Sequence, residues 1–320
     1  MTFDVAGLSR RGVNLSRQAN CRQNTTFMEY IYRQETQEDR LNQHVLIPAA
    51  TIRKPAPGNS TVDDRILVNT QTGEIFLNAP GLSLHFPMLV VRHGQTNGNV
   101  KRTFQGQIDG PENQLNHVGK AQVKKAAKGV YAELTGLLGA HLKDFAGSGR
   151  LILLSSPLSR AQETANAFVQ EFEQQTGITL TCTLEKDLAE ICFGVIEGHT
   201  FEEIKDPELQ ELIERFRLNQ DAIVDWKGTG ESFLDVVTRA NQLLERLNAQ
   251  YDGKDVFVIS FAHGTLINAL RVAVGDRALI EENGLIAFRK HHVDNAQPYW
   301  LGHSQQLAEQ LCERAVPKSA

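Results

Sequence analysis

The sequence is short of cysteine and of long apolar runs, and each shortage excludes a class of protein. Its four cysteines, Cys21, Cys182, Cys192 and Cys312, have no paired spacing, which fits thiols in a reducing compartment better than disulfides or a zinc site. No apolar run approaches the roughly 20 residues of a membrane helix. The N-terminal stretch MTFDVAGLSRRGVN has no apolar core, so we expect no signal peptide and a cytoplasmic location.

An excess of basic residues is also missing. The 33 Lys and Arg residues face 38 Asp and Glu residues, for a formal net charge of −5. This balance argues against a nucleic-acid or membrane-surface partner, although it is compatible with a local basic pocket. No Gly-rich loop ends in Gly-Lys-Ser/Thr, so no P-loop module is expected. The 320 residues, 41% hydrophobic and 22% charged, suit a globular protein of one large or two small domains.

The first quarter of the chain differs from the rest. Residues 1 to about 44 are rich in Gln, Asn and Arg, which predicts a loose or partly helical segment. Apolar runs at 66–68 and 75–77 flank a turn that contains Gly73, and they predict a β-hairpin near 64–79. We interpret residues 1–87 as an N-terminal extension that packs on or caps the main domain, 88–302, and residues 303–320 as a C-terminal helical tail.

From residue 88 onward, buried strands alternate with helices. Apolar runs predict strands at 88–91, 151–154, 180–184, 256–259 and 299–301, and helical spacing predicts helices at 118–142, 158–172, 233–247 and 266–274. Thr200 and Glu203 have the form of a capping box, which predicts a further helix opening there. The alternation predicts an α/β fold with helices on both faces of a sheet.

The most informative stretch is 89–96, an apolar strand that ends in Arg92, His93 and Gly94. In open α/β sheets, ligands bind in the crevice beyond the carboxyl ends of the strands. We therefore interpret His93 as a candidate nucleophile and Arg92 as a candidate anion clamp. An isolated Arg-His-Gly is more often a histidine in a turn, so this interpretation depends on three further patches.

Each of the three patches follows a predicted strand. Arg160 stands at the start of a helix, where a guanidinium and free backbone N–H groups favour an anion. Glu190 is flanked by apolar residues, and a carboxyl in apolar surroundings is pushed toward its protonated form and can act as a general acid. His263 repeats the His-Gly pair. We expect the four patches to converge, and together they suit phosphoryl transfer through a phosphohistidine.

The motifs that carry these residues are, in order, VRHGQTNGN, QLNHVGKAQ, SSPLSRAQETA, LAEICFGVIEG, GTGES and FAHGTLINAL. Over roughly residues 88–302 this ordered set strongly resembles the histidine phosphatase superfamily, the phosphoglycerate mutase-like enzymes. The resemblance implies a three-layer α/β sandwich with a mixed, mostly parallel sheet, and no metal or other cofactor. It also implies that His93 is the phosphorylated nucleophile and Glu190 the proton donor. The phosphate pocket would be formed by Arg92, Asn99, Arg160 and His263.

Two positions depart from the family pattern: Ala262 stands where serine is common, and Thr265 where glycine is common. We expect neither to touch a catalytic group. The branch is indicated by the 73 residues from Glu190 to His263, a short interval that resembles the phosphatases, whereas the mutases carry a long insert there. Fructose-2,6-bisphosphatases share a similar GVxEGxTxEEI stretch. They hold a second phosphate with a cation-rich segment before Gly-Glu-Ser, and here that segment, 221–227, has one cation.

Two other interpretations are weaker. His291, His292, Asp294 and His303 could suggest a metal site, but their spacing matches no established ligand pattern, so loop histidines are favoured. A non-catalytic binding protein on the same fold would be favoured by the loss of a catalytic residue, and none is lost. The sequence therefore predicts a metal-independent phosphatase acting on a small phosphorylated metabolite or another phosphomonoester. The alternative is a cofactor-dependent phosphoglycerate mutase or a fructose-2,6-bisphosphatase-like enzyme, and the sequence is compatible with a homo-oligomer.

Overall fold

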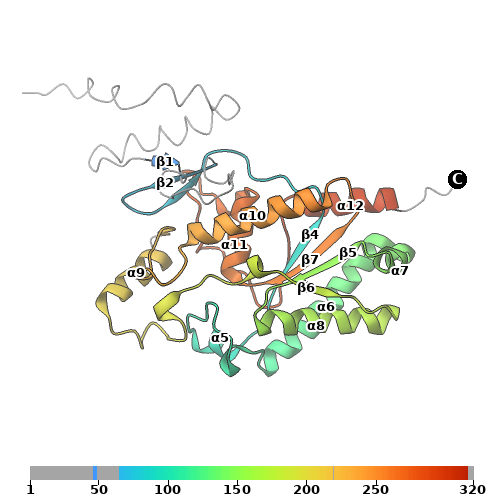
Figure 1. Ribbon diagram of the computed structural model, residues 1–320, viewed down its shortest axis with the longest axis horizontal. Helices are drawn as coiled ribbons and strands as arrows, with labels where there is room; N and C mark the ends of the chain where they lie inside the picture. The colour runs from blue at the N-terminus through green and yellow to red at the C-terminus, as the bar shows by residue number, and fades with distance from the viewer. Residues whose placement is uncertain (1–45, 49–64, 219, 316–320) are drawn as a thin grey trace, which may run out of the picture.

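The computed structural model describes residues 46–48, 65–218 and 220–315. Its centre is a five-stranded sheet in the order β6-β5-β7-β4-β8 (Figure 1). The four strands β4, β5, β6 and β7 run parallel to one another, whereas β8 runs antiparallel to β4. The strands are β4 Met88–Arg92, β5 Leu151–Ser155, β6 Cys182–Leu184, β7 Phe257–Ala262 and β8 Pro298–Trp300. The expected mixed, mostly parallel sheet is confirmed.

Helices cover both faces of this sheet and make the expected three layers. The central strands are mostly apolar because a parallel strand is buried on both faces, and every residue of β7 is buried. α10 (Phe233–Tyr251) and α11 (Gly264–Ala273) contribute to one core, which also includes side chains of α9 (Pro207–Arg217). The other core is formed with α6 (His117–Leu138), α7 (Leu142–Gly147), α8 (Ser159–Thr176) and α12 (Ser304–Ala315). Figure 1 shows α10 above the sheet and α6 and α8 below it.

One predicted helix start is wrong. The capping-box hydrogen bonds form, from the Thr200 amide to Glu203 Oε2 (2.8 Å) and from the Glu203 amide to Thr200 Oγ1 (3.3 Å). They close only a turn, and the helix, α9, begins at Pro207 with Asp206 as its N-cap. A proline disfavours helical backbone at the residue before it, so a helix opened at Thr200 cannot run through Asp206.

The predicted hairpin is present and packs into the main core. β2 (Ile66–Asn69) and β3 (Ile75–Leu77) pair antiparallel, and β1 (Leu46–Pro48) pairs with β2 in the same three-stranded sheet. Ile66, Val68 and Ile75 belong to the same buried cluster as α10 and α11. The expected loose segment, 1 to about 44, lies outside the described residues.

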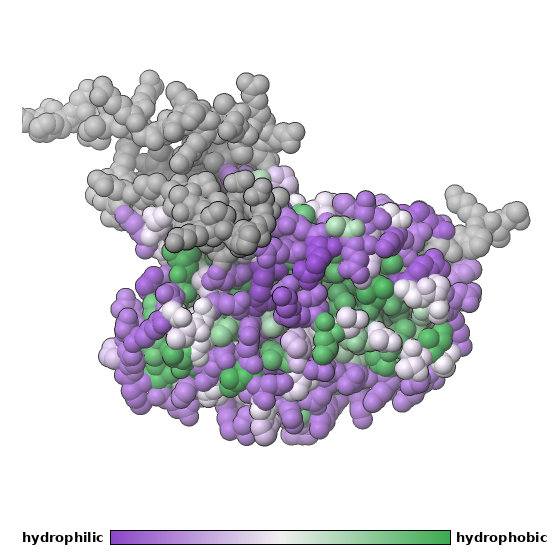
Figure 2. All heavy atoms as spheres, viewed as in Figure 1, coloured by the Kyte–Doolittle hydropathy of each residue, from purple (hydrophilic) through white to green (hydrophobic). Residues whose placement is uncertain are grey.

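The visible surface is mostly polar. On the face shown in Figure 2, hydrophilic residues predominate and apolar residues form small groups among them. In the part of the chain that the structure describes, no helix combines the length and the apolar character that a membrane span requires. Cys182, Cys192 and Cys312 are free thiols, and Cys21 lies outside the described residues.

Candidate active site

The four sequence patches meet at one cavity of about 210 Å³ at the carboxyl ends of the parallel strands. His93 follows β4, Arg160 lies in the first turn of α8 after β5, and His263 follows β7. Glu190 comes from the loop after β6. The predicted residues that line the cavity are Arg92, His93, Asn99, Arg160 and Glu190. The sixth, His263, packs against His93, with 5.1 Å between the ring centroids.

His93 is held in one orientation and one tautomer. Its backbone N–H donates to the Ala262 carbonyl (2.9 Å), and its Nδ1 lies 2.7 Å from the Gly94 carbonyl oxygen. A carbonyl only accepts, so Nδ1 carries the proton and Nε2 keeps a free lone pair. Burial and then the positive charges of Arg160 and Arg92 hold the pKa of His93 well below its usual range. The side chain is therefore a neutral imidazole at neutral pH.

His263 is neutral for the same reasons. It is fully buried, and burial, then Arg160, then His93 hold its pKa well below the usual value. Its Nε2 lies 2.8 Å from Ser156 Oγ, and its Nδ1 has no hydrogen-bond partner. A buried ring nitrogen without a partner is rare, and here it stands beside the candidate nucleophile.

Arg92, which is half-buried, and Arg160, which is buried, bring two guanidinium groups to the cavity. Arg160 donates to the carbonyls of Gly106 (2.7 Å) and Ile108 (3.3 Å), and Arg92 donates to the carbonyl of Val293. The Nε of each arginine is buried and has no partner. Burial lowers the pKa of Arg160 to about 10, so the group stays charged at neutral pH. Both guanidiniums thus retain unused N–H groups for an anion.

The carboxylate of Glu190 lies at the first turn of α11. Its Oε1 accepts from the amides of Ile191 (2.9 Å) and Leu266 (3.2 Å), and its Oε2 accepts from the amide of Thr265 (3.2 Å). The expected apolar surroundings are therefore wrong for the carboxylate itself, although buried Ile191 and Leu188 flank its backbone. The expectation that Thr265 touches no catalytic group is also wrong, because its amide contacts this carboxylate and it lines the cavity.

Asn99 reaches the cavity from α5 (Asn97–Lys101). Its Oδ1 accepts from the amide (3.0 Å) and hydroxyl (3.1 Å) of Thr96, which caps the helix. Asn295 Nδ2 also lies 3.3 Å from this oxygen. The oxygen is thus engaged in the capping box, and the side-chain NH₂ of Asn99 is the group available to a ligand.

A clamp that sequence reasoning missed holds the Glu190 loop. Arg239 of α10 donates to the Glu190 carbonyl (3.0 Å), the Asp187 carbonyl (2.9 Å) and Glu231 Oε1 (2.8 Å). Gln107 Nε2 donates to the Glu190 carbonyl as well (2.9 Å). Glu231 is the acid of the Gly-Glu-Ser motif, so the motif supports the backbone of the candidate acid.

Sequence reasoning also missed three arginines that line the cavity, Arg102, Arg217 and Arg289. The one cation of the segment 221–227 is Lys227. It pairs with Asp206 (2.6 Å) and Glu208 (2.8 Å) and does not line the cavity. The extra cations come instead from the end of α5, the end of α9 and the loop before β8. No motif connects these three places in the sequence.

Comparison with known proteins decides the family. The model of the histidine phosphatase superfamily (branch 1) matches residues 88–309, more than half of the chain. The chain belongs to the histidine phosphatase superfamily. All six predicted site residues lie within the matched range.

Several known proteins are similar to the chain, two of them named as phosphatases. Mannitol-1-phosphatase of Eimeria tenella is 32% identical over 169 residues, which cover 52% of this chain and 49% of that protein. Glucosyl-3-phosphoglycerate phosphatase of Mycobacterium tuberculosis is 31% identical over 193 residues, which cover 58% and 74%. A bifunctional protein of the same organism is 34% identical over 185 residues, covering 57% of this chain. The chain spans 42% of the length of that last relative.

Two solved structures cover a similar part of the chain. The native structure of mycobacterial glucosyl-3-phosphoglycerate phosphatase is 27% identical, with a TM-score of 0.47. It covers 67% of this chain and 88% of its own. A structure described as mycobacterial hydrolase 1 is 28% identical, with a TM-score of 0.48, and covers 67% and 87%.

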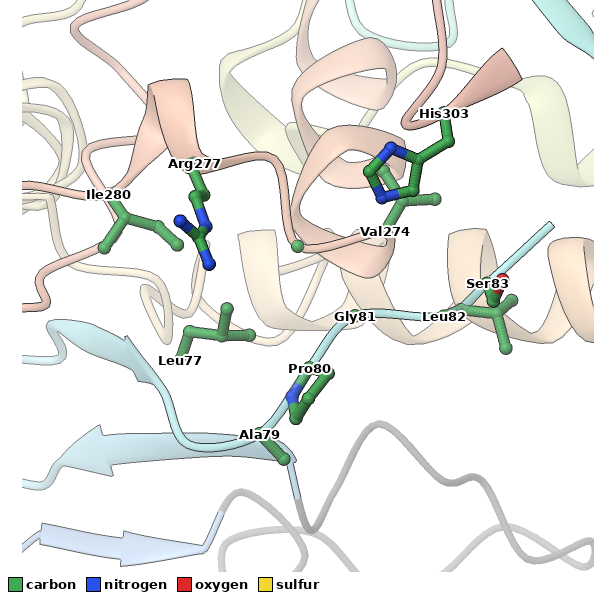
Figure 3. A pocket seen from close by; sticks show the side chains of 11 residues that line it. Leu77, Ala79, Pro80, Gly81, Leu82, Ser83, Val274, Arg277, Ile280 and His303 are labelled. Carbon is green, nitrogen blue, oxygen red and sulfur yellow. The ribbon is translucent and has the colours of Figure 1, made fainter. Parts of the chain in front are cut away.

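A larger cavity of about 710 Å³ lies apart from the His93 cavity (Figure 3). It is bordered by the segment 77–83 after β3 and by Val274 and Gly275 at the end of α11. Figure 3 shows Arg277 and His303 at its edge among mostly apolar side chains. This cavity shares no lining residue with the His93 cavity.

The histidines weighed as metal ligands do not gather at one place. His292 and Asp294 are exposed and lie 3.6 Å apart, while His303 lines the larger cavity. Among the described residues, no group of three His, Cys, Asp or Glu side chains could hold a metal ion.

Proposed function

We propose that the chain hydrolyses phosphomonoesters of small metabolites, without a metal ion, through a phosphohistidine on His93. One observation carries the proposal: a buried, neutral His93 with a free Nε2 stands beside two arginines that retain unused N–H groups. An imidazole in this state is a competent nucleophile toward phosphorus. The similar proteins named as phosphatases support the same reaction class.

In the first step, Nε2 of His93 attacks phosphorus and the ester P–O bond breaks. Arg92, Arg160 and the Asn99 amide hold the non-bridging oxygens, whose charge needs fixed donors in the transition state. Glu190, in its protonated form, gives its proton to the leaving oxygen, so the alcohol departs neutral. His263 stands against the His93 ring and can donate one further hydrogen bond to the phosphoryl group from its unpartnered Nδ1.

In the second step, a water molecule attacks the phosphohistidine. The Glu190 carboxylate takes a proton from this water, the P–N bond breaks, and His93 recovers its lone pair. Inorganic phosphate leaves and Glu190 is again protonated. The clamp formed by Arg239, Glu231 and Gln107 keeps the Glu190 backbone fixed while its side chain changes role.

Trapping the intermediate tests this proposal. Wild-type protein quenched during turnover should carry acid-labile, base-stable phosphate, and His93→Ala should carry none and lose turnover. EDTA should leave the rate unchanged. Near-normal turnover by His93→Ala would overturn the assignment, and a rate lost to EDTA and restored by magnesium would overturn metal independence.

Hydrolysis is proposed in preference to mutase transfer. The short interval from Glu190 to His263 leaves little protein to exclude water from the phosphohistidine, and none of the described residues before Arg92 lines the cavity. The two reactions separate when 3-phosphoglycerate is supplied with a trace of 2,3-bisphosphoglycerate. Release of free phosphate should outpace formation of 2-phosphoglycerate, and the opposite order would favour the mutase.

A further inference from the structure

The cavity holds far more positive charge than one phosphate needs. Five arginines and a single acidic residue, Glu190, line it, in a chain whose net charge is −5. A phosphomonoester carries a charge of about −2 at neutral pH. Among the described residues, none of the five arginines takes part in an ion pair. Charge complementarity therefore calls for a second anionic group on the ligand.

Arg289 is the innermost of the three additional arginines. Its guanidinium lies over the Phe216 ring, 5.0 Å from the centroid, and its backbone amide donates to Gln220 Oε1 (2.9 Å). Its Nε is buried and has no hydrogen-bond partner. Burial, and then the positive charge of Arg217, lowers the pKa of Arg289 to about 10. A buried donor without an acceptor, beside another cation, is costly unless an anion binds there.

Arg217 and Arg102 stand at the rim. Arg217 is the last residue of α9, and Arg102 caps the end of α5 with a left-handed backbone (φ 59°). Both are exposed. The exposed Glu202 is the nearby acid: its own amide and Thr200 lower its pKa first, and Arg217 and Arg102 lower it further. The two rim arginines therefore lie close enough to Glu202 that both act on its charge.

The neighbouring Arg215 shows that the free arginines are a distinct set. Arg215 also lies on α9, but it is bound to the buried Asp221 (2.6 Å) and does not line the cavity. Arg217, two residues later, has no such partner and faces the cavity. On α9, Arg215 therefore stabilises the fold through its ion pair, whereas Arg217 is available to a ligand.

We propose that Arg102, Arg217 and Arg289 form a second anion subsite, and that the preferred substrate is a small phosphomonoester carrying a second anionic group, a carboxylate or a phosphate. This inference rests on the proposed function for the first phosphate. The cavity volume of about 210 Å³ fits a compact molecule better than a long or polymeric one. The second group would bind at the rim while the transferred phosphate lies against His93.

Binding to His93→Ala protein tests the subsite without turnover. Calorimetry at fixed ionic strength compares three ligands of similar size: glycerol 3-phosphate, 3-phosphoglycerate and glycerol 1,3-bisphosphate. The second or third should bind about tenfold or more tightly than the first, as expected for added charge-assisted hydrogen bonds. Whichever of the two binds more tightly identifies the second group as carboxylate or phosphate.

Substitutions in the same background assign the gain to the rim. Arg217→Gln and Arg102→Gln should each remove most of the tightening and leave the affinity for glycerol 3-phosphate within about threefold. Both side chains are exposed, so folding is not at risk. Arg289→Gln should have the same effect on the affinities, and thermal melting checks that this variant is folded, because the Arg289 Nε is buried. Lys101→Gln is the matched control, because Lys101 is an exposed cation on α5 that pairs with Glu112 and does not line the cavity. It should change none of the three affinities.

Three results would overturn the subsite. The three ligands could bind alike, the rim variants could weaken all three equally, or none could bind measurably. These outcomes are separate from failure of the proposed function, which is read from phosphate release and phosphohistidine trapping in the wild-type protein. A ligand preference without any hydrolysis would support the subsite and overturn the phosphatase.

Discussion

The imidazole of His93 is buried next to two guanidinium groups, and both conditions disfavour a second proton. Burial removes the water that would solvate an imidazolium, and Arg160 and Arg92 repel it. His263 lies in the same situation. The positive charges that we propose to bind a phosphate thus also keep the proposed nucleophile in its neutral form.

This arrangement makes the stability of the protein dependent on pH. Histidines of the unfolded chain bind protons near pH 6.5, whereas His93 and His263 stay neutral to lower pH. Below pH 6.5 the unfolded chain therefore binds more protons than the folded protein, and the free energy of unfolding falls as the pH decreases. Each buried histidine should lower the free energy of unfolding by about 1.4 kcal/mol for each pH unit below this value. Urea unfolding between pH 7 and pH 5 should show a smaller slope in His263→Gln and His93→Gln, and an unchanged slope would contradict this.

Glu190→Gln separates the acid role from a structural one. Removal of a general acid costs about 10²–10⁴ in rate when the leaving group needs its proton. We expect a loss of that size on an alkyl phosphate and a much smaller loss on p-nitrophenyl phosphate, whose leaving group departs without protonation. Equal losses on both substrates, measured as kcat, would assign Glu190 a structural role through its bonds to the α11 amides.

Helix α10 holds the loop that carries the candidate acid. Arg239 fills three acceptors in that loop and in Gly-Glu-Ser, so Arg239→Met should let the Glu190 backbone move. We expect a kcat loss of about tenfold or more on alkyl phosphates, a smaller loss on p-nitrophenyl phosphate, and little change in KM. A merely destabilising effect would lower the two rates equally.

The matched control is Arg246→Met. Arg246 lies two turns further along α10 and pairs with the side chains of Glu185 (2.7 Å) and Asp187 (3.1 Å), not with the Glu190 carbonyl. It should leave the ratio of alkyl to p-nitrophenyl rates unchanged. A shift in that ratio as large as in Arg239→Met would show that the effect follows from the loss of any contact to the loop before Glu190, and not from the loss of the bond to the Glu190 carbonyl.

The strand ends could be predicted from the sequence, and the rim could not. His93 and His263 follow continuous apolar runs, and parallel strands bring their carboxyl ends to one edge, so position along the chain was enough. Arg102 depends on a left-handed helix cap, and Arg289 depends on a loop packed on Phe216. The helix predicted to begin at Thr200 is wrong for a similar reason. The local hydrogen bonds form as expected, but the helix begins at Pro207 because proline disfavours helical backbone at the residue before it.

The N-terminal hairpin packs against the loop that carries Arg289. The Ile286 amide donates to the Ile75 carbonyl (2.9 Å), and Phe76 bridges to Leu285, three to four residues before Arg289. The hairpin turn also contacts the segment that follows α9, since the Ala222 amide donates to the Gly73 carbonyl (2.8 Å). None of the described residues of the extension lines the cavity, so the hairpin contacts only the segments next to those that carry Arg217 and Arg289.

Substitution of Gly73 measures this contact. Gly73 has φ 73°, and a Cβ there would lie 1.8 Å from Asp221 Oδ1. Gly177 has nearly the same backbone (φ 76°), but a Cβ there would meet nothing within 4 Å. Gly177→Ala should therefore cost only the left-handed strain, about 1–2 kcal/mol of unfolding free energy.

Gly73→Ala should cost that strain and about 1–3 kcal/mol more, because Asp221 and its bound Arg215 must shift. Urea unfolding of the two variants at pH 7 gives the difference directly, since the backbone term is common to both. Equal losses would mean that the hairpin turn does not press on Asp221, and that the extension reaches the rim only through Ile75 and Phe76. A larger loss in Gly73→Ala makes the hairpin part of the same cooperative unit as the elements that carry Arg217 and Arg289.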